Sequence, residues 1–173
     1  SYNRYGFARV VNKYDIRGFI KEQSFFGPDG KLCHTDDGYA KVLSHYDRKG
    51  NLVECLCFGI DENLCYSKKI GCSRIAYKYD ANGNITEISC YDVNNELVKV
   101  REGFARLVNN YDYNGNLKEQ LMYAVDGRLC YCKNGFARVV NDYDNRSNLI
   151  QQTFYDIKGN LCFASCSQTM VET

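Results

Sequence analysis

The chain has 173 residues, of which 45% are hydrophobic and 25% are charged, so it can bury a core of ordinary composition. Its formal net charge is +1 at pH 7, which does not favour binding to nucleic acid or to an anionic membrane through bulk electrostatics. No apolar run approaches the roughly 18 residues that a membrane-spanning helix needs. We therefore expect no nucleic-acid partner and no membrane span.

The sequence repeats itself at a nearly constant interval. A Tyr-Asp pair recurs with spacings of 32, 33, 32 and 32 residues, starting at Tyr14, Tyr46, Tyr79, Tyr111 and Tyr143. The fullest copy of the phrase spans residues 79–85 and reads Tyr-Asp-Ala-Asn-Gly-Asn-Ile. A fixed period of this length is typical of tandem-repeat proteins. We treat residues 1–173 as one array of five repeats, which begin at Gly6, Gly38, Gly71, Gly103 and Gly135.

Each repeat is expected to contain three short strands. Its opening stretch, such as residues 7–14, is rich in β-branched and aromatic side chains, which favour a strand. The Asp-x-x-Gly that follows favours a tight hairpin turn, because Asp can cap the backbone two residues on and Gly accepts a positive φ. A second strand follows, residues 84–91 in the third repeat, and then a second turn and a short third strand around Leu32-Cys33 and its equivalents.

No stretch has helical periodicity with caps, so the sequence predicts an all-β chain. We expect about fifteen short antiparallel strands in a β-solenoid or an elongated twisted meander. Neither end of the array shows an obvious capping repeat, although repeat arrays usually hide their end strands. This indicates that the chain is a segment of a longer array or that it associates with itself end to end.

Two apolar columns are constant in the five repeats. The leucine column is expected to face a continuous core and consists of Leu32, Leu64, Leu97, Leu129 and Leu161. The tyrosine column is formed by the Tyr-Asp pairs. We interpret it as a structural ladder in which each hydroxyl has a fixed partner, with an aromatic ligand-binding strip as the alternative.

A basic column provides the candidate binding residues, and an acidic column runs beside it. The basic residues are Arg9, Lys41, Arg74, Arg106 and Arg138. The acidic column is Glu22, Glu54, Glu87 and Glu119, with Gln151 in the fifth repeat. Because the two columns lie on the two arms of one hairpin, we expect cross-strand ion pairs that neutralise the basic column. Arg138 should then be the least neutralised member. The alternative is a charged strip for an extended polymer or partner.

Most of the ten cysteines stand in apolar columns. Four of them share a column with Val98, namely Cys33, Cys65, Cys130 and Cys162. Such residues are expected to be small buried hydrophobic groups with free thiols, which suits a reducing compartment such as the cytoplasm. If they formed disulfides instead, a secreted or cell-surface location would follow.

The sequence contains no catalytic constellation. The Cys-x-Cys pairs and the two histidines, His34 and His45, lack the spacing of a structural zinc site. No phosphate-binding loop, Gly-x-Ser-x-Gly or His-Glu-x-x-His motif occurs. The repeated Asp-x-x-Gly turns lack the carboxylate density of calcium loops. We therefore predict that the protein is not an enzyme and that it needs neither a metal nor a cofactor.

The motifs resemble those of bacterial tandem-repeat proteins. Residues 79–85 are similar to the Tyr-Asp repeat of RHS-type proteins, and the Gly-Phe-Ala-Arg-Val of residues 135–139 is similar to the start of WG-type repeats. The combination with Phe-Gly-Pro-Asp-Gly-Lys at residues 26–31 most resembles repeat arrays in bacterial proteins of unknown function. The resemblance implies a β-sheet repeat architecture and, through the RHS type, a structural segment of a larger toxin-associated protein.

From these observations we expect a non-catalytic repeat scaffold that mediates protein–protein interaction or adhesion. The main alternative is a carbohydrate- or cell-wall-binding module, which requires Tyr and Phe rings exposed in rows on one face. The expected partner is thus a protein, or else a glycan.

Overall fold

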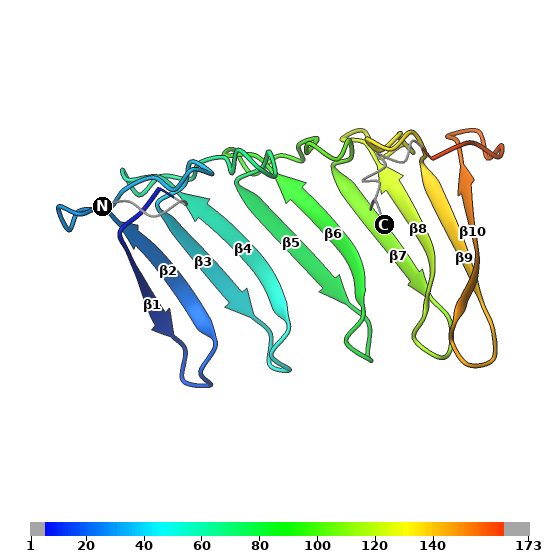
Figure 1. Ribbon diagram of the computed structural model, residues 1–173, viewed down its shortest axis with the longest axis horizontal. Coiled ribbons are helices and arrows are strands. Elements are labelled where there is room, and N and C mark those ends of the chain that lie inside the picture. The colour runs from blue at the N-terminus through cyan, green and yellow to red at the C-terminus, as the bar shows by residue number, and fades with distance from the viewer. Residues whose placement is uncertain (1–5, 165–173) are drawn as a thin grey trace, which may run out of the picture.

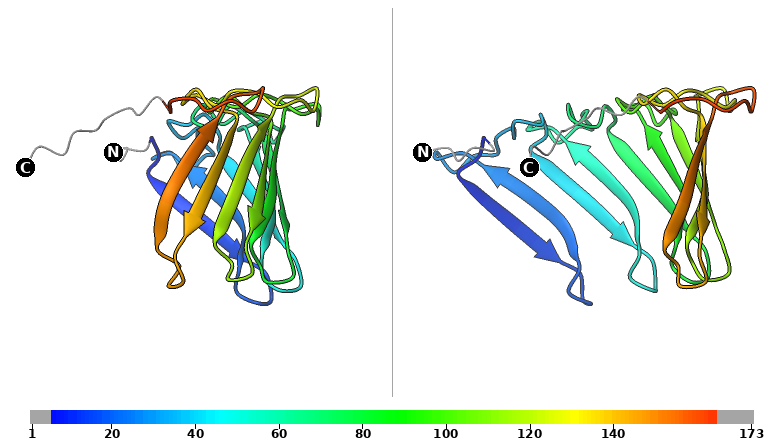
Figure 2. Two further views of the ribbon diagram at one scale, coloured as in Figure 1. Left: turned by 90° about the vertical axis from the view of Figure 1, so that its right-hand side faces the viewer. Right: turned by 45° about the vertical axis from the view of Figure 1, so that its right-hand side comes forward.

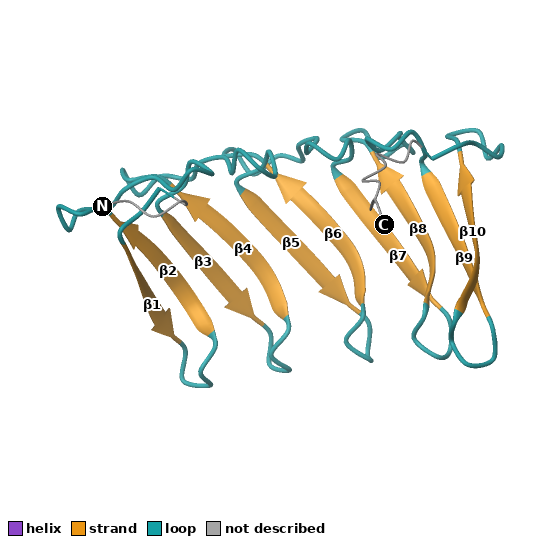
Figure 3. Cartoon of the chain, viewed as in Figure 1, coloured by secondary structure: helices purple, strands orange, loops and turns teal. Residues whose placement is uncertain are grey.

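The computed structural model describes residues 6–164, and all ten strands belong to one antiparallel sheet (Figures 1 and 3). The strands are neighbours in the sheet in the order in which they occur in the chain. They are β1 (Arg9–Tyr14), β2 (Ile20–Phe26), β3 (Lys41–Tyr46), β4 (Leu52–Phe58), β5 (Arg74–Tyr79), β6 (Ile85–Tyr91), β7 (Arg106–Tyr111), β8 (Leu117–Tyr123), β9 (Arg138–Tyr143) and β10 (Leu149–Tyr155). The described residues contain no helix, so the all-β prediction and the antiparallel meander are confirmed.

Strands pair most closely within five hairpins, which we number 1 to 5 in chain order, β1–β2 to β9–β10. The tight turn of hairpin 3 shows how they close. The carboxylate of Asp80 accepts the backbone N–H groups of Asn82 and Asn84 at 2.9 Å each and the side-chain amide of Asn84 at 2.9 Å. Gly83 follows at φ 91°, where a side chain would be strained. In hairpin 5 the same position is Ser147, at φ 63°.

Neighbouring hairpins are joined by fewer pairs than the strands of one hairpin. The β2–β3 junction, for example, has only three registered pairs, Glu22↔Leu43, Gln23↔Val42 and Ser24↔Lys41. Towards the tight turns the hairpins therefore diverge, as Figure 1 shows.

The tyrosine column ties neighbouring hairpins together where they diverge. Each hydroxyl donates to a carbonyl at the start of the preceding hairpin's second strand, and the four bonds are Tyr46 to Ile20 (3.1 Å), Tyr79 to Leu52 (2.7 Å), Tyr111 to Ile85 (2.9 Å) and Tyr143 to Leu117 (3.0 Å). This geometry supports the structural interpretation of the column. Tyr14 has no preceding hairpin among the described residues, and it is 54% exposed.

Linkers connect the hairpins at the end of the sheet opposite the tight turns (Figure 2). They are linker 1 (27–40), linker 2 (59–73), linker 3 (92–105) and linker 4 (124–137). The expected third strand of each repeat is reduced to one isolated bridge, such as Phe26↔Leu32, so the prediction of fifteen strands is wrong. The linker turns again at residues 35–38 to reach the next hairpin, which leaves too few residues for a longer pairing.

At this end of the sheet the linkers pack against one face, which we call the linker face; it carries Phe25, Cys57, Cys90, Met122 and Phe154 of the second strands. One cluster joins Phe136 of linker 4 to Leu107, Met122 and Val139. A second cluster joins Cys72 and Val100 of linkers 2 and 3 to Cys90. The opposite face, called the outer face, carries Phe26, Phe58, Tyr91, Tyr123 and Tyr155 at the ends of the second strands.

The leucine column does not form the core. Leu32, Leu64, Leu97 and Leu129 are only partly buried, and Leu161 is 74% exposed. Each leucine bridges to the aromatic residue that ends the second strand of its hairpin, which places the column beside the outer-face ring. The prediction of a continuous leucine core is therefore wrong. The leucines pair with the outer-face residues of the second strands, whereas the buried apolar residues of these strands point to the opposite face.

Candidate functional site

The predicted basic residues lie in one row on the outer face. Each lies over the aromatic ring directly opposite it in its own hairpin, as expected of a cross-strand pair. The distances from cation to ring centroid are 4.7 Å for Arg9–Phe26, 5.2 Å for Lys41–Phe58, 3.8 Å for Arg74–Tyr91, 4.5 Å for Arg106–Tyr123 and 4.9 Å for Arg138–Tyr155. These contacts are within the range of cation–π attraction, so each basic side chain stabilises its own hairpin.

The arginines pair with carboxylates of the preceding hairpin, whereas the sequence predicted partners within the same hairpin. Arg74 contacts Glu54 at 2.6 Å. The equivalent contacts are Arg106 with Glu87 at 3.3 Å and Arg138 with Glu119. The register explains the difference, because Arg74 lies opposite Leu56, beside Glu54. Within a hairpin the glutamates have other partners, which are Lys13 for Glu22, His45 for Glu54, Lys78 for Glu87 and Asn110 for Glu119.

The prediction that Arg138 is the least neutralised basic residue is consequently wrong. Arg138 pairs with Glu119, and the loss of the acid at Gln151 affects the outer side of β10 instead. Among the described residues Arg9 has no carboxylate partner, and Lys41 contacts Glu62 at 3.3 Å. Burial raises the pKa of Glu54, but hydrogen bonds from Arg74 and His45 outweigh it and hold the pKa below its usual value. The basic row is therefore largely neutralised.

The aromatic rings of the outer face are half-buried beneath the basic side chains. A glycan platform needs ring faces open to solvent, and here one face of each ring is occupied by a cation. The outer face thus offers a regular but covered aromatic row.

The linker face contains two hollows in equivalent positions. The first hollow, of about 270 Å³, is lined by Phe7, Gln23, Phe25, Thr35, Asp36, Asp37 and Tyr39. The second hollow, of about 350 Å³, is lined by Glu102, Phe104, Gln120, Met122, Cys132, Lys133, Asn134 and Phe136. Adding 97 to each residue number of the first hollow gives a residue of the second, so the two lie three hairpins apart.

Both hollows combine an apolar floor with an amide wall. In the first, the rings of Phe7 and Phe25 lie 4.9 Å apart and those of Phe25 and Tyr39 lie 5.8 Å apart. Gln23 donates its side-chain amide to Asn12 at 3.0 Å. Gln120 makes the same bond to Asn109 in the second, also at 3.0 Å. Among the described residues neither glutamine carbonyl oxygen accepts a hydrogen bond, so each hollow presents a free acceptor beside apolar side chains.

At hairpin 3, between the two hollows, the equivalent space is filled. Cys72, Cys90 and Val100 form a buried cluster there, and Ile88 stands where the hollows have glutamine. Burial and the neighbouring thiol both raise the pKa of Cys90, and burial raises that of Cys57. Such thiols are poor nucleophiles.

The nine cysteines among residues 6–164 are free thiols. Cys72 and Cys90 are buried, as the apolar columns predicted. For the other cysteines in apolar columns the prediction of full burial is wrong, because these side chains are only partly buried: Cys33, Cys57, Cys65, Cys130 and Cys162. The thiol of Cys130 in linker 4 contacts the carbonyl of Gly103 in linker 3 at 3.5 Å. Within the described part of the chain, no group of three or more His, Cys, Asp or Glu side chains is placed to hold a metal ion.

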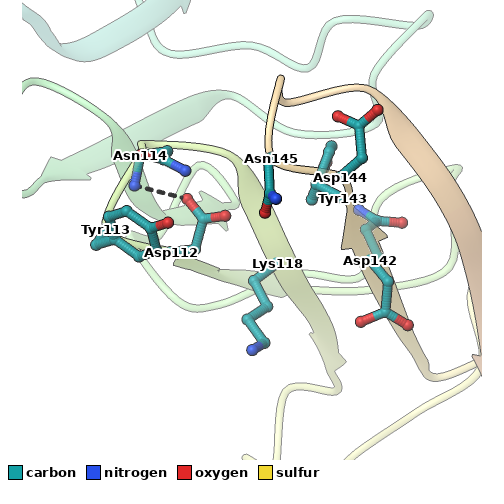
Figure 4. A pocket seen from close by; sticks show the side chains of 9 residues that line it. Asp112, Tyr113, Asn114, Lys118, Asp142, Tyr143, Asp144 and Asn145 are labelled. Atoms are coloured by element: carbon teal, nitrogen blue, oxygen red, sulfur yellow. Dashed lines mark hydrogen bonds between the residues drawn. The ribbon is translucent and has the colours of Figure 1, made fainter.

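A third hollow, of about 210 Å³, lies between the tight turns of hairpins 4 and 5 (Figure 4). Its polar lining includes Asp112, Lys118 and Asp144. Both aspartates are engaged in their own turns, Asp112 with the N–H of Asn114 at 2.9 Å and Asp144 with that of Arg146 at 2.8 Å. Tyr143 donates to Leu117. Because two of its three carboxylates, Asp112 and Asp144, already serve the turns, this hollow is a weaker candidate than the two on the linker face.

Sequence reasoning missed the linker-face hollows, although a signal was present. An Asn and a Gln eleven residues apart occur in hairpins 1, 4 and 5 as Asn12–Gln23, Asn109–Gln120 and Asn141–Gln152, and each pair is hydrogen-bonded. Hairpins 2 and 3 have Ser44–Cys55 and Tyr77–Ile88 at these positions. The Asn–Gln pair is thus present at both hairpins that have a linker-face hollow, and also at hairpin 5.

In comparisons with known proteins, no family model matches the chain and no curated protein is significantly similar to it. Residues 6–164 include no helix with the length and apolar character of a membrane span.

Proposed function

We propose that the chain is a tandem-repeat, non-catalytic scaffold that binds another protein, and that it does so by holding an extended segment along the linker face. The observation that supports this proposal is the recurrence of one hollow at equivalent positions three hairpins apart. A surface that presents the same binding chemistry twice suits a polymeric ligand with side chains at regular intervals.

The chemistry of each hollow fits one apolar side chain of a polypeptide. The aromatic and methionine floor contacts the side chain, and the glutamine carbonyl oxygen accepts a backbone N–H from the segment. From β2 to β8 there are six strand spacings, or about 29 Å, which an extended chain of about nine residues covers. Each hollow is small, so affinity comes from two anchors on one segment.

Selection from a random 16-residue peptide display library tests the proposal. We expect enriched peptides with two large apolar residues about eight to ten positions apart. Gln23→Leu or Gln120→Leu should each weaken a selected peptide about fivefold, because one hydrogen bond is lost. Arg106→Gln, on the outer face, is the matched control and should leave the affinity unchanged. Selected peptides that respond only to Arg106→Gln would contradict binding at the linker face.

A glycan is the second candidate, and the composition of the first hollow favours it. Three aromatic rings and the polar side chains of Gln23 and Asp36 are the groups that bind sugar faces and hydroxyls. Soluble cell-wall polysaccharides titrated against the protein test this alternative. Saturable binding that Gln23→Leu weakens, with no enrichment in the peptide selection, would replace the protein partner by a glycan.

A further inference from the structure

The four junctions between hairpins use the same main-chain bond. The N–H of the sixth residue in each second strand donates to a carbonyl just before the next hairpin, and the bonds are Phe25 to Ala40 (2.9 Å), Cys57 to Ser73 (2.8 Å), Cys90 to Ala105 (3.0 Å) and Met122 to Ala137 (3.0 Å). The tyrosine–carbonyl bond accompanies it at all four junctions. At three junctions an arginine also contacts the preceding glutamate.

β1 and β10 are the edge strands of the sheet, and each carries the groups that one side of such a junction contributes. On the outer side of β10 are the N–H of Phe154, the carbonyl of Leu149 and the side chain of Gln151. On the outer side of β1 are the carbonyl of Ala8, the hydroxyl of Tyr14 and the guanidinium of Arg9. Within residues 6–164 no strand pairs with either outer side.

The β10 edge lacks the features that usually prevent edge pairing. Edge strands are commonly protected by charged residues, proline or short length. The seven residues of β10 read LIQQTFY and include no charge, whereas the second strand of every other hairpin contains a glutamate. Leu149 and Ile150 are 53% and 66% exposed. An uncharged, apolar edge of this length favours addition of another strand.

We propose that β10 of one copy of this chain pairs with β1 of a second copy, antiparallel and head to tail, so that the junction between hairpins continues between molecules. Tyr14 of the second copy would donate to the Leu149 carbonyl, and Phe154 N–H would donate to the Ala8 carbonyl. Arg9 would donate to the side-chain oxygen of Gln151, whose amide nitrogen already donates to Thr153 at 3.1 Å. This contact is heterologous, so assembly is open-ended.

The residue opposite Gln151 in hairpin 5 explains why the proposed acceptor for Arg9 is an amide and not a carboxylate. The residue opposite Gln151 is Asp142, whereas Glu22, Glu54 and Glu87 lie opposite Lys13, His45 and Lys78. A glutamate opposite Asp142 would be repelled. The intermolecular junction therefore pairs the Arg9 cation with an uncharged amide, and it should be weaker and less sensitive to salt than the internal ones.

Sedimentation velocity of the purified full chain over a wide concentration range tests the proposal. We expect the weight-average mass to rise steadily beyond that of a dimer. Tyr14→Phe should weaken association two- to tenfold through loss of one hydrogen bond. Tyr79→Phe, at an internal junction, is the matched control and should leave association unchanged.

A second variant tests the direction of pairing. Asp142→Lys with Gln151→Glu copies the Lys78–Glu87 pair onto hairpin 5 and gives Arg9 a carboxylate partner. It should strengthen association up to about fivefold, as expected for one exposed ion pair. A mass that stops at the dimer, with no response to Tyr14→Phe, would instead indicate β10 pairing with β10. A monomer at all concentrations would overturn the proposal.

These outcomes are independent of the peptide selection. The residues changed in the association variants line neither of the two linker-face hollows, so these variants should bind a selected peptide as the unmodified chain does.

Discussion

The two faces of the sheet are stabilised in different ways. On the linker face the residue types change from hairpin to hairpin, from Phe25 to Cys90 and Met122, yet these side chains are all buried. On the outer face a single arrangement recurs, with a base over a ring and, at three junctions, a carboxylate from the preceding hairpin. A single-layer sheet has no second layer to cover it, so each face needs its own cover.

The linker face is stabilised by side-chain packing, whereas the outer face is stabilised by contacts between fixed cross-strand positions. The linker face depends on filling space, so it tolerates changes of residue type and leaves hollows where the filling is incomplete. The outer face depends on cross-strand positions, so its residue types are nearly constant although its side chains are partly exposed. We expect burial on the linker face to contribute most of the stability and contacts on the outer face to fix how adjacent hairpins align.

The largest expected effect separates burial on the two faces. Met122→Ala, on the linker face, should lower the free energy of unfolding by about 2–5 kcal/mol, because Met122 is 3% exposed in a packed cluster. Leu121→Ala, the neighbouring residue on the outer face, is only partly buried and should cost less than half as much. Urea unfolding followed by tyrosine fluorescence measures both, since the chain has no tryptophan. Equal losses would contradict the assignment of the core to the linker face.

A smaller effect is expected from the basic row. Arg74 stacks on Tyr91, contacts Glu54 and has a side chain only 18% exposed, so Arg74→Gln should cost about 1–2 kcal/mol. Arg138→Gln should cost less, because the Arg138 side chain is 38% exposed. Arg9→Gln should cost least, because Arg9 has no carboxylate partner among the described residues. Urea midpoints of the three variants at low and high salt measure this order. A reversed order would show that the ion pairs between hairpins do not contribute.

The tyrosine bonds between hairpins should be worth somewhat less. Tyr111→Phe removes the donor to the Ile85 carbonyl and should lower stability by about 1 kcal/mol. Tyr14→Phe should have no effect at concentrations where the chain is monomeric, since no described carbonyl accepts its hydroxyl. Thermal unfolding of the two variants side by side provides the measurement. An equal loss in both would show that ring packing, and not the hydroxyl, matters.

The smallest effects are expected from pH, and they should act on different faces. A hydrogen bond from Lys13 holds the pKa of Glu22 below its usual value of 4.5. A lowered pKa stabilises the fold above pH 4.5, and this stabilisation is lost as the pH falls through the folded-state value. Loss of this contact in acid should therefore weaken the outer face.

Alkali should act on the linker face. Burial raises the pKa of Tyr77 from 10 to about 12, so the neutral phenol contributes stability that is complete below pH 10 and is lost as the pH rises towards 12. Urea midpoints measured from pH 3 to 11.5 test both limbs. Tyr77→Phe should flatten the alkaline limb alone, and Lys13→Met should reduce the acid limb alone. A variant that alters the opposite limb would contradict the assignment.

The sequence predicted those features that depend on neighbours along the chain. The turn at Asp80 and Gly83 and the strands that flank it follow from residue types at fixed spacing. The sequence did not predict the partner of Arg74, because the register between hairpins is set by the path of the linker, which no local motif encodes. The prediction of a third strand is wrong for the same reason, since Leu32 makes one bridge before linker 1 turns away.

The hollows also could not be predicted by comparing equivalent positions of the five repeats. They arise where side chains of a linker leave a space beside Gln23 or Gln120, whereas Cys72 and Val100 fill it in the centre. Whether a space is filled depends on the shapes of several side chains from different repeats together. The recurring Asn–Gln spacing shows the position of the amide wall and gives no information on the volume in front of it.

The strands contact only their neighbours in the chain, so the molecule has no closure that fixes its length. A duplicate of residues 71–102, inserted after residue 102, would add two strands and lengthen the sheet by about 10 Å. The two hollows would then stand about three peptide residues further apart, since an extended chain advances about 3.3 Å per residue. The copy number of the central unit would therefore set the distance between the two hollows.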